Sequence, residues 1–296
     1  MDAGKPAPLY DRIFRRLEKA RWNLAEIPFD AIDTSLVDGE ALTFLRVNCL
    51  MELSSLYATR MFLRDFRDNP DFCQFMSIWY YEEMKHYLVL REYLKAYDMA
   101  PDVATFTELD TELSPSPWAP TLALHYCGEL RLGMWYQRWS RETKEPVLSK
   151  IYRLIGNDEF RHAACYEEFM EQAFQRDPSV LVDFMQAAKW MLVNPNRDKH
   201  PTTMKSALET DRSVVDSIEG YEVLQRHIQR TISDDDEQNV RRQVLATLSR
   251  LAGRELRKLA DLAAHARELE KQRRARVSEG LIEGSGEGPS AEAPRP

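Results

Sequence analysis

Two short stretches of the chain decide the fold, Trp79–His86 (WYYEEMKH) and Asn157–His162 (NDEFRH). Each stretch contains a Glu-x-x-His unit, which ends at His86 in the first stretch and at His162 in the second. Residues three apart lie on one face of a helix, so each unit directs a carboxylate and an imidazole toward one point. Both units therefore predict helices that carry ligating side chains.

An isolated acidic residue in an apolar helical stretch precedes each unit. Glu52 lies 31 residues before Glu83, and Glu129 lies 30 residues before Glu159. The spacing of their apolar neighbours places Glu52 and Glu129 on helix faces that should contact the core. A carboxylate inside a core is costly unless it is paired or coordinates a metal. The predicted inward-facing set is Glu52, Glu83, His86, Glu129, Glu159 and His162.

The two halves of this set repeat with almost the same spacing. Glu52 and Glu129 are 77 residues apart, and Glu83 and Glu159 are 76 residues apart. A duplicated helix pair with a pseudo-twofold axis would bring the six side chains around one centre. One Glu from each of two helices and a Glu-x-x-His unit from each of two others is the ligand pattern of di-iron and di-manganese bundles. Buried salt bridges without a metal are the alternative interpretation.

The composition fits a helical protein with a large core. Of 296 residues, 44% are apolar and only 11 are glycine, and the net charge of −8 disfavours a general nucleic-acid binder. No stretch approaches the roughly 18 apolar residues of a membrane-spanning helix, and no signal-peptide segment follows the N-terminus. The four cysteines lack the spacing of a zinc site. We expect an all-α, cytoplasmic protein that contacts neither nucleic acid nor membrane.

Four regions are expected along the chain. Residues 1–34 form a leader with a basic segment, and residues 35–195 form the metal-binding bundle. The four bundle helices are predicted over 35–66, 70–97, 118–141 and 144–176. The connection of about 20 residues between the second and third helices indicates a crossover, as in ferritin-like four-helix bundles. Residues 196–277 form additional helices on the bundle, the last over 233–277, and residues 278–296 form a disordered tail.

With these motifs the chain resembles the ferritin-like di-iron superfamily. Trp79–His86 and Asn157–His162 are similar to the two iron motifs of soluble acyl-acyl-carrier-protein desaturases, over roughly residues 35–195. The resemblance implies that the six side chains bind two iron ions, with manganese an alternative in one site. It implies that Glu83 and Glu159 bridge the ions and that Asp158 holds an imidazole, a support that such ligands need. Trp22 would correspond to a tryptophan on the family's electron path.

The activity implied by the resemblance is that of an O2-activating non-haem di-iron oxidoreductase, of desaturase or oxygenase type, on a small organic or acyl substrate. O2 is the expected co-substrate, and the missing flavin and nicotinamide motifs call for an external electron donor, a ferredoxin or a reductase. An acyl carrier protein is a candidate partner, and desaturases are commonly homodimers, so we expect a homodimer.

One position departs from the desaturase pattern. Desaturases carry a Thr three residues after the third-helix Glu, beside the oxygen-binding position, and this chain has Leu132 there. We therefore expect a drier pocket, in which oxygenation is at least as favoured as desaturation. The alternative function is that of a ferritin-like iron-binding or ferroxidase protein, although about 100 residues after the fourth helix leave little room in a cage-building protomer.

Overall fold

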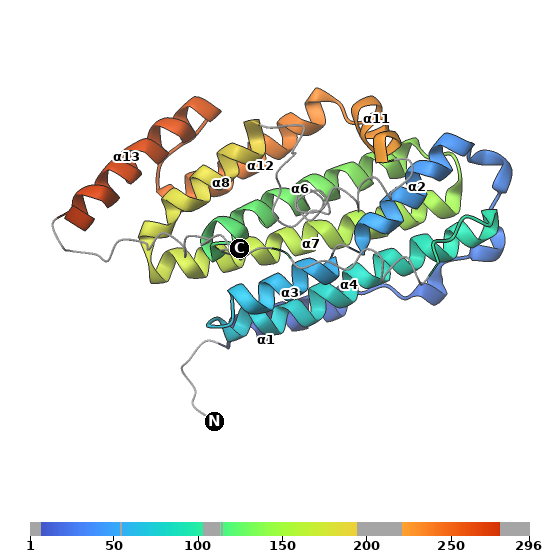
Figure 1. Cartoon of the computed structure of the whole chain (residues 1–296), viewed down its shortest axis with the longest axis horizontal. Helices are drawn as coiled ribbons and strands as arrows, with labels where there is room; N and C mark the ends of the chain where they lie inside the picture. The colour runs from blue at the N-terminus through green and yellow to red at the C-terminus, as the bar shows by residue number, and fades with distance from the viewer. Residues whose placement is uncertain (1–6, 54, 103–112, 114, 194–220, 279–296) are drawn as a thin grey trace, which may run out of the picture.

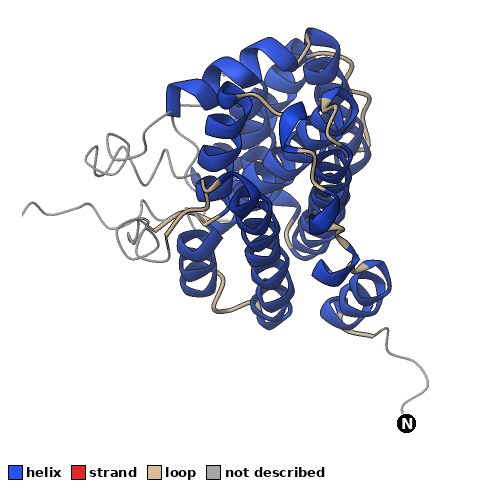
Figure 2. Cartoon of the chain, turned by 90° about the vertical axis from the view of Figure 1, so that its right-hand side faces the viewer, coloured by secondary structure: helices blue, strands red, loops and turns tan. Residues whose placement is uncertain are grey.

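A four-helix bundle forms the centre of the molecule, in a computed structural model that describes residues 7–53, 55–102, 113, 115–193 and 221–278. Its helices are α2 (Gly39–Glu52) continued by α3 (Ser55–Asp65), α4 (Pro70–Leu94), α6 (Trp118–Glu142) and α7 (Pro146–Arg176). α2 and α3 pack on α4, α6 packs along α7, and α4 contacts α7 (Figure 1). Every described element is a helix (Figure 2), and the predicted all-α fold with a four-helix bundle is confirmed.

Side-chain caps fix the starts of the two helices that carry the Glu-x-x-His units. Asn69 accepts a hydrogen bond from the Phe72 N–H and Pro70 follows it at the first helical position, so α4 begins there. Glu145, fully buried, accepts hydrogen bonds from two N–H groups of the first turn of α7. These caps set where both helices begin.

The helix predicted over residues 35–66 is not continuous, and that prediction is wrong. After the short 3-10 helix Thr34–Leu36, α2 ends at Glu52 and α3 begins at Ser55. The Leu53 N–H donates to the carbonyl of Leu50, a 3-10 closure, and the Ser55 hydroxyl donates to the carbonyl of Glu52 at 2.7 Å. The break falls directly after the first predicted ligand.

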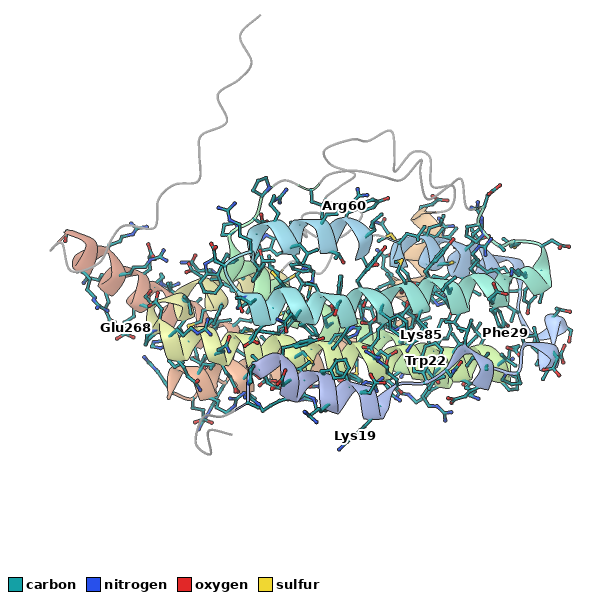
Figure 3. The ribbon with its side chains drawn as sticks, turned by 90° about the horizontal axis from the view of Figure 1, so that it is seen from below. Lys19, Trp22, Phe29, Arg60, Lys85 and Glu268 are labelled. Atoms are coloured by element: carbon teal, nitrogen blue, oxygen red, sulfur yellow. The ribbon has the colours of Figure 1, made fainter. Side chains whose placement is uncertain are left out.

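The predicted leader contains a helix that belongs to the core. α1 (Leu9–Ala20) packs on α4 and buries Leu9, Ile13 and Leu17. Three 3-10 helices, Leu24–Glu26, Phe29–Ala31 and Thr34–Leu36, connect it to α2. Figure 3 shows α1 running along the underside of the bundle, with Trp22 next to Lys85 of α4.

Helices after residue 177 cover the outer side of the bundle. They are α8 (Leu181–Val193), after the 3-10 turn Pro178–Val180, then α11 (Tyr221–Thr231), α12 (Asp234–Ala252) and α13 (Leu259–Ser278). α8 and α12 pack on α6, α11 on α2, and α13 on α8 (Figure 1). Arg131 of α6, almost fully buried, joins them by donating to the Glu237 carboxylate of α12 and to the Met191 carbonyl of α8.

The single helix predicted over 233–277 is also wrong. α12 ends at Gly253, which adopts the left-handed conformation (φ +59°) that only glycine reaches at no steric cost. The predicted tail beyond residue 278 and most of the connection between the second and third bundle helices lie outside the described residues. Among the described helices, none is long and apolar enough to cross a membrane.

Candidate metal centre

The six predicted ligands come together at the middle of the bundle. Glu52 stands at the end of α2, and α4, α6 and α7 supply the other five. Their donor atoms form two groups, each with all atoms within 4.8 Å of one another: Glu52, Glu83, His86 and Glu159; and Glu83, Glu129, Glu159 and His162. Glu83 and Glu159 belong to both groups, and every member is buried. The arrangement is that of two adjacent four-donor sites with two shared carboxylates.

Each imidazole turns its Nδ1 atom toward the carboxylates of the cluster. His86 Nδ1 lies 3.7 Å from Glu52 and 3.5 Å from Glu159. His162 Nδ1 lies 3.2 Å from Glu83 and from Glu159 and 3.8 Å from Glu129. The two rings are therefore placed alike, one in each four-donor group.

The opposite ring nitrogens are held by two further carboxylates. His86 Nε2 lies 3.1 Å from Asp158 of α7, and His162 Nε2 lies 3.0 Å from Glu82 of α4. An ionised carboxylate only accepts, so Nε2 carries a proton in each ring, and Nδ1 could bind a metal through its lone pair once it has lost its own proton. Asp158 directly precedes Glu159 but orients His86, the histidine of the other unit. In the same way, Glu82 directly precedes Glu83 but orients His162.

Sequence reasoning identified Asp158 but missed Glu82. The signal was present, because an acidic residue precedes the Glu of both Glu-x-x-His units. The adjacent Glu83 obscured this signal. Of two consecutive glutamates on a helix, one is expected to face the core and the other to face the solvent. In the structure Glu82 has no exposed surface.

The cluster contains polar atoms that its own residues leave unsatisfied and that metal ions could satisfy. Three of its donor atoms, Glu83 Oε1, His86 Nδ1 and Glu159 Oε1, are buried without a hydrogen-bond partner. Such atoms are rare in folded proteins because each costs the desolvation of a polar group. Four carboxylates with two imidazoles form the donor set that suits Fe(II) or Mn(II). Two divalent cations would satisfy these atoms and balance the buried negative charge.

The pKa values of the carboxyl groups in the cluster also indicate that the site lacks positive charge. Burial raises the pKa of Glu83 to about 7; the charge of Glu129 raises it further, and the nearby His162 and His86 rings oppose this rise. Burial, with repulsion from Glu83 and Glu129, raises the pKa of Glu159 well above its usual value. Burial alone would raise the pKa of Glu129, but the hydrogen bond and charge of His162 outweigh it and lower this pKa to about 2. Without metal, these groups share protons in place of cations.

Buried neighbours orient the two outer carboxylates. The Tyr136 hydroxyl donates a short hydrogen bond to Glu52 and accepts one from the Asn48 amide at 2.8 Å. The Trp79 indole donates to Glu129 at 3.0 Å. Neither Tyr136 nor Trp79 belongs to the set of inward-facing residues predicted from the sequence. Neither hydrogen bond could be read from helix periodicity, because each joins residues at least 50 positions apart.

Trp22 reaches the centre through Asp158. Its indole N–H donates to Asp158 at 2.6 Å, and the same oxygen faces His86. Arg161 pairs with the other Asp158 oxygen, and the Lys85 ammonium lies 4.3 Å from the centre of the Trp22 ring (Figure 3). Trp22 is 7% exposed, so the path from ligand to tryptophan ends next to the surface.

The interpretation of Leu132 is wrong. Its side chain is 36% exposed, so it does not form a dry wall beside the buried ligands. Gly133, the next residue, is the one in contact with α7, because a Cβ there would lie 2.8 Å from the Phe160 ring. The spacing from Glu129 alone did not reveal which side of α6 faces α7.

Two comparisons with known proteins give a match. The family model described as fatty acid desaturase matches residues 136–278, which include the second Glu-x-x-His unit. Among solved structures, the R2-like ligand-binding oxidase from Sulfolobus acidocaldarius is 14% identical, with 88% of this chain and 97% of that chain covered and a TM-score of 0.43. No curated protein matches. The family match covers just under half of the chain, and the six buried Glu and His side chains on the bundle helices are similar in pattern to the ligands of ferritin-like di-iron proteins.

Proposed function

We propose that this protein is an O2-activating non-haem di-iron oxidoreductase that oxidises a small organic or acyl substrate. The observation that carries the proposal is the pair of buried four-donor groups that share Glu83 and Glu159. Iron bound there would supply electrons to O2 and the oxidising power for the substrate. The match to the fatty acid desaturase family supports an oxidoreductase. Manganese in one of the two sites is compatible with the same donors.

The protein's own contribution is to hold the ligands and exclude water. Asp158 and Glu82 fix the two imidazoles, and Tyr136 and Trp79 fix the outer carboxylates. Phe62 stands edge-on to Trp79 and completes an apolar wall on the Glu129 side. A dry, preorganised enclosure keeps a reactive oxidant from being quenched by solvent.

Electrons are proposed to come from an external donor protein through Trp22, Asp158 and His86. The chain of contacts is short, 2.6 Å and then 3.1 Å, and its outer end is Trp22, two residues after the end of α1. α1 and the residue after it carry basic side chains that an acidic ferredoxin, reductase or acyl carrier protein could contact: Arg12, Arg15, Arg16, Lys19 and Arg21. We further propose that the protein acts as a homodimer.

Rapid mixing of the anaerobic Fe(II)-loaded protein with O2 tests the proposal. We expect fast consumption of O2, a transient visible absorbance, and acceleration by an oxidisable substrate. Slow oxidation directly to Fe(III), unaffected by any substrate, together with a multi-subunit cage in solution, would instead support an iron-storage protein. The outer helices α8 and α12, which cover α6, favour the enzyme because storage protomers are nearly bare bundles.

A further inference from the structure

Lys85 of α4 is a buried ammonium group that lies over the ring of Trp22. Its side chain is 7% exposed, and Nζ lies 4.3 Å from the centre of the indole ring (Figure 3). Nζ donates to the Trp22 carbonyl oxygen at 3.4 Å and lies 4.0 Å from the Asp158 carboxylate. These two acceptors hold the ammonium against the face of the indole, where the ring quadrupole attracts a cation.

A second aromatic ring lies beside the same ammonium. Tyr81 of α4 is 55% exposed, and its ring centre lies 5.6 Å from Lys85 Nζ. The guanidinium of Arg21 lies 5.2 Å from the same ring centre. Positive charge therefore lies beside both aromatic rings, the buried Trp22 and the exposed Tyr81.

A positive charge beside an indole opposes the removal of an electron from the ring. Loss of one electron leaves the indole positively charged, and the repulsion between this charge and the Lys85 ammonium is strong where little water screens it. The N–H proton of the oxidised indole would pass to Asp158, its acceptor at 2.6 Å. Arg161 and Lys85 flank that carboxylate and stabilise its ionised form, so they also oppose the proton transfer.

The other indole that is bonded to a carboxylate of the cluster has different surroundings. Trp79 donates to Glu129 at 3.0 Å, and its ring is edge-on to Phe62 and His125. In the described part of the chain, no lysine or arginine lies over the Trp79 ring. A cation over the ring is thus no general consequence of an indole–carboxylate hydrogen bond in this bundle. It is found at the tryptophan that directly follows the basic segment of α1.

We propose that Lys85 is a positioning residue that acts through Trp22: its charge makes the indole resist oxidation, so that the oxidised centre does not take electrons from Trp22. This proposal rests on the proposed function, because a strong oxidant at the centre is what makes such protection useful. An electron drawn from Trp22 would leave the substrate unoxidised and the tryptophan modified. Transfer inward from a donor is not opposed, because the same charge attracts an arriving electron.

Oxidation of the Zn(II)-loaded, full-length protein by hexachloroiridate(IV) under nitrogen tests the proposal. Two equivalents of this one-electron oxidant and one water convert an indole to its hydroxylated form, with two protons released and two Ir(III) ions formed. Peptide mass spectrometry measures the rate at which Trp22 gains one oxygen atom. Lys85→Gln retains a donor for the Trp22 carbonyl but loses the charge, and we expect it to speed this reaction about 10-fold or more.

Two control variants separate charge from packing. Lys85→Arg retains the charge and should react at the parent rate, whereas a role of Lys85 confined to packing would give the Arg and Gln variants similar rates. Lys189→Gln, at an exposed lysine of α8, removes one charge elsewhere and should also leave the rate unchanged. Because the oxidant is an anion, loss of a lysine charge weakens its attraction to the protein, so faster oxidation cannot come from electrostatic steering.

Two results would overturn the proposal: oxidation of Trp22 in folded Lys85→Gln no faster than in the parent, or equally fast oxidation in Lys85→Arg and Lys85→Gln. Circular dichroism checks the fold, and Lys85→Met, with an unbranched apolar side chain, carries the same expectation if the Gln variant does not fold. The experiment uses neither iron nor O2, so its failure is distinct from failure of the proposed oxidase chemistry. Faster oxidation of Trp22 in Lys85→Gln, in a protein whose Fe(II)-loaded form does not react with O2, would refute only the proposed function.

Discussion

The two halves of the candidate centre start from one sequence pattern and lie in different surroundings. The His86 half draws its support from Asp158, which also contacts Trp22, Arg161 and Lys85. The His162 half draws its support from Glu82, whose other oxygen lies 3.6 Å from Arg21. Among the described residues, only the first half has an aromatic side chain, Trp22, hydrogen-bonded to the acid that supports its imidazole.

The helices of the two halves differ as well. The helix that carries Glu52 stops at that residue, whereas α6 continues for more than three turns past Glu129. The duplicated spacing therefore determines where the candidate ligands lie. Segments that are not duplicated, such as α1, determine which residues surround each half. We infer that the halves bind metal alike and exchange electrons differently.

Removal of a shared carboxylate should have the largest effect. Glu83→Ala takes a donor from both four-donor groups, so the folded protein should lose most of its metal, from about two ions per chain toward none. Glu129→Ala and Glu52→Ala each disturb one group and should retain about one ion. Metal analysis with native mass spectrometry measures the stoichiometry, and circular dichroism checks the fold. A Glu129→Ala protein that still holds two ions would falsify its assignment as a ligand.

Substitution of the supporting acids should separate the two halves. Asp158→Asn and Glu82→Gln each remove the acceptor that orients one imidazole, and each should weaken metal binding about 10- to 100-fold. Asp158→Asn should also slow reduction of the Fe(III)-loaded protein by a plant-type [2Fe–2S] ferredoxin, and Glu82→Gln should not. The reason is that, of the two acids, Asp158 is the one hydrogen-bonded to Trp22. Equal slowing in both variants, measured at full metal loading, would show that the two halves do not differ in electron transfer.

The metal-free protein should lose stability as the pH rises from about 4.5 to 7. Burial raises the pKa of Glu83 from 4.5 to about 7, so the folded state holds a proton that the unfolded state has released across this window. The free energy of unfolding should therefore be highest below pH 4.5 and should fall by up to about 3 kcal/mol by pH 7. Urea unfolding at several pH values measures it, and the metal-loaded protein should show a smaller change. A metal-free protein that gains stability over this window would contradict the buried, proton-sharing cluster.

The smallest expected effects concern the residues that orient the outer carboxylates. Tyr136→Phe removes a donor to Glu52 and leaves the Asn48 amide without its acceptor, which should cost about 1–3 kcal/mol of unfolding free energy. Trp79→Phe should cost a similar amount on the Glu129 side. Metal stoichiometry should stay at about two in both variants. Loss of an ion from either one would mean that the hydrogen bond is needed for ligation.

Much of this centre was predictable because helices have a fixed period. The faces of the long helices follow from the spacing of apolar residues, so the six inward side chains could be identified one by one. The role of Asp158 came from the resemblance to known motifs. What could not be predicted depends on contacts between distant residues: the hydrogen bond from Trp22 crosses 136 positions, and that from Tyr136 crosses 84.

The wrong predictions have local causes that periodicity does not report. The break after Glu52 uses a 3-10 closure and a serine hydroxyl, neither of which interrupts the apolar pattern. The end of α12 depends on the left-handed conformation of one residue, Gly253. A glycine at this position is a signal for the end of a helix, and the sequence analysis overlooked it. Leu132 was placed by its distance from Glu129, and the rotation of α6 within the bundle exposes it.

Anomalous diffraction at the iron edge, from crystals of the Fe(II)-loaded protein, tests the central claim most directly. Two adjacent four-donor groups that share Glu83 and Glu159 predict two peaks, roughly 3.5–4 Å apart, one beside His86 and one beside His162. Glu52→Ala should remove only the peak beside His86. A single peak, or iron bound away from these two imidazoles, would contradict the duplicated metal centre.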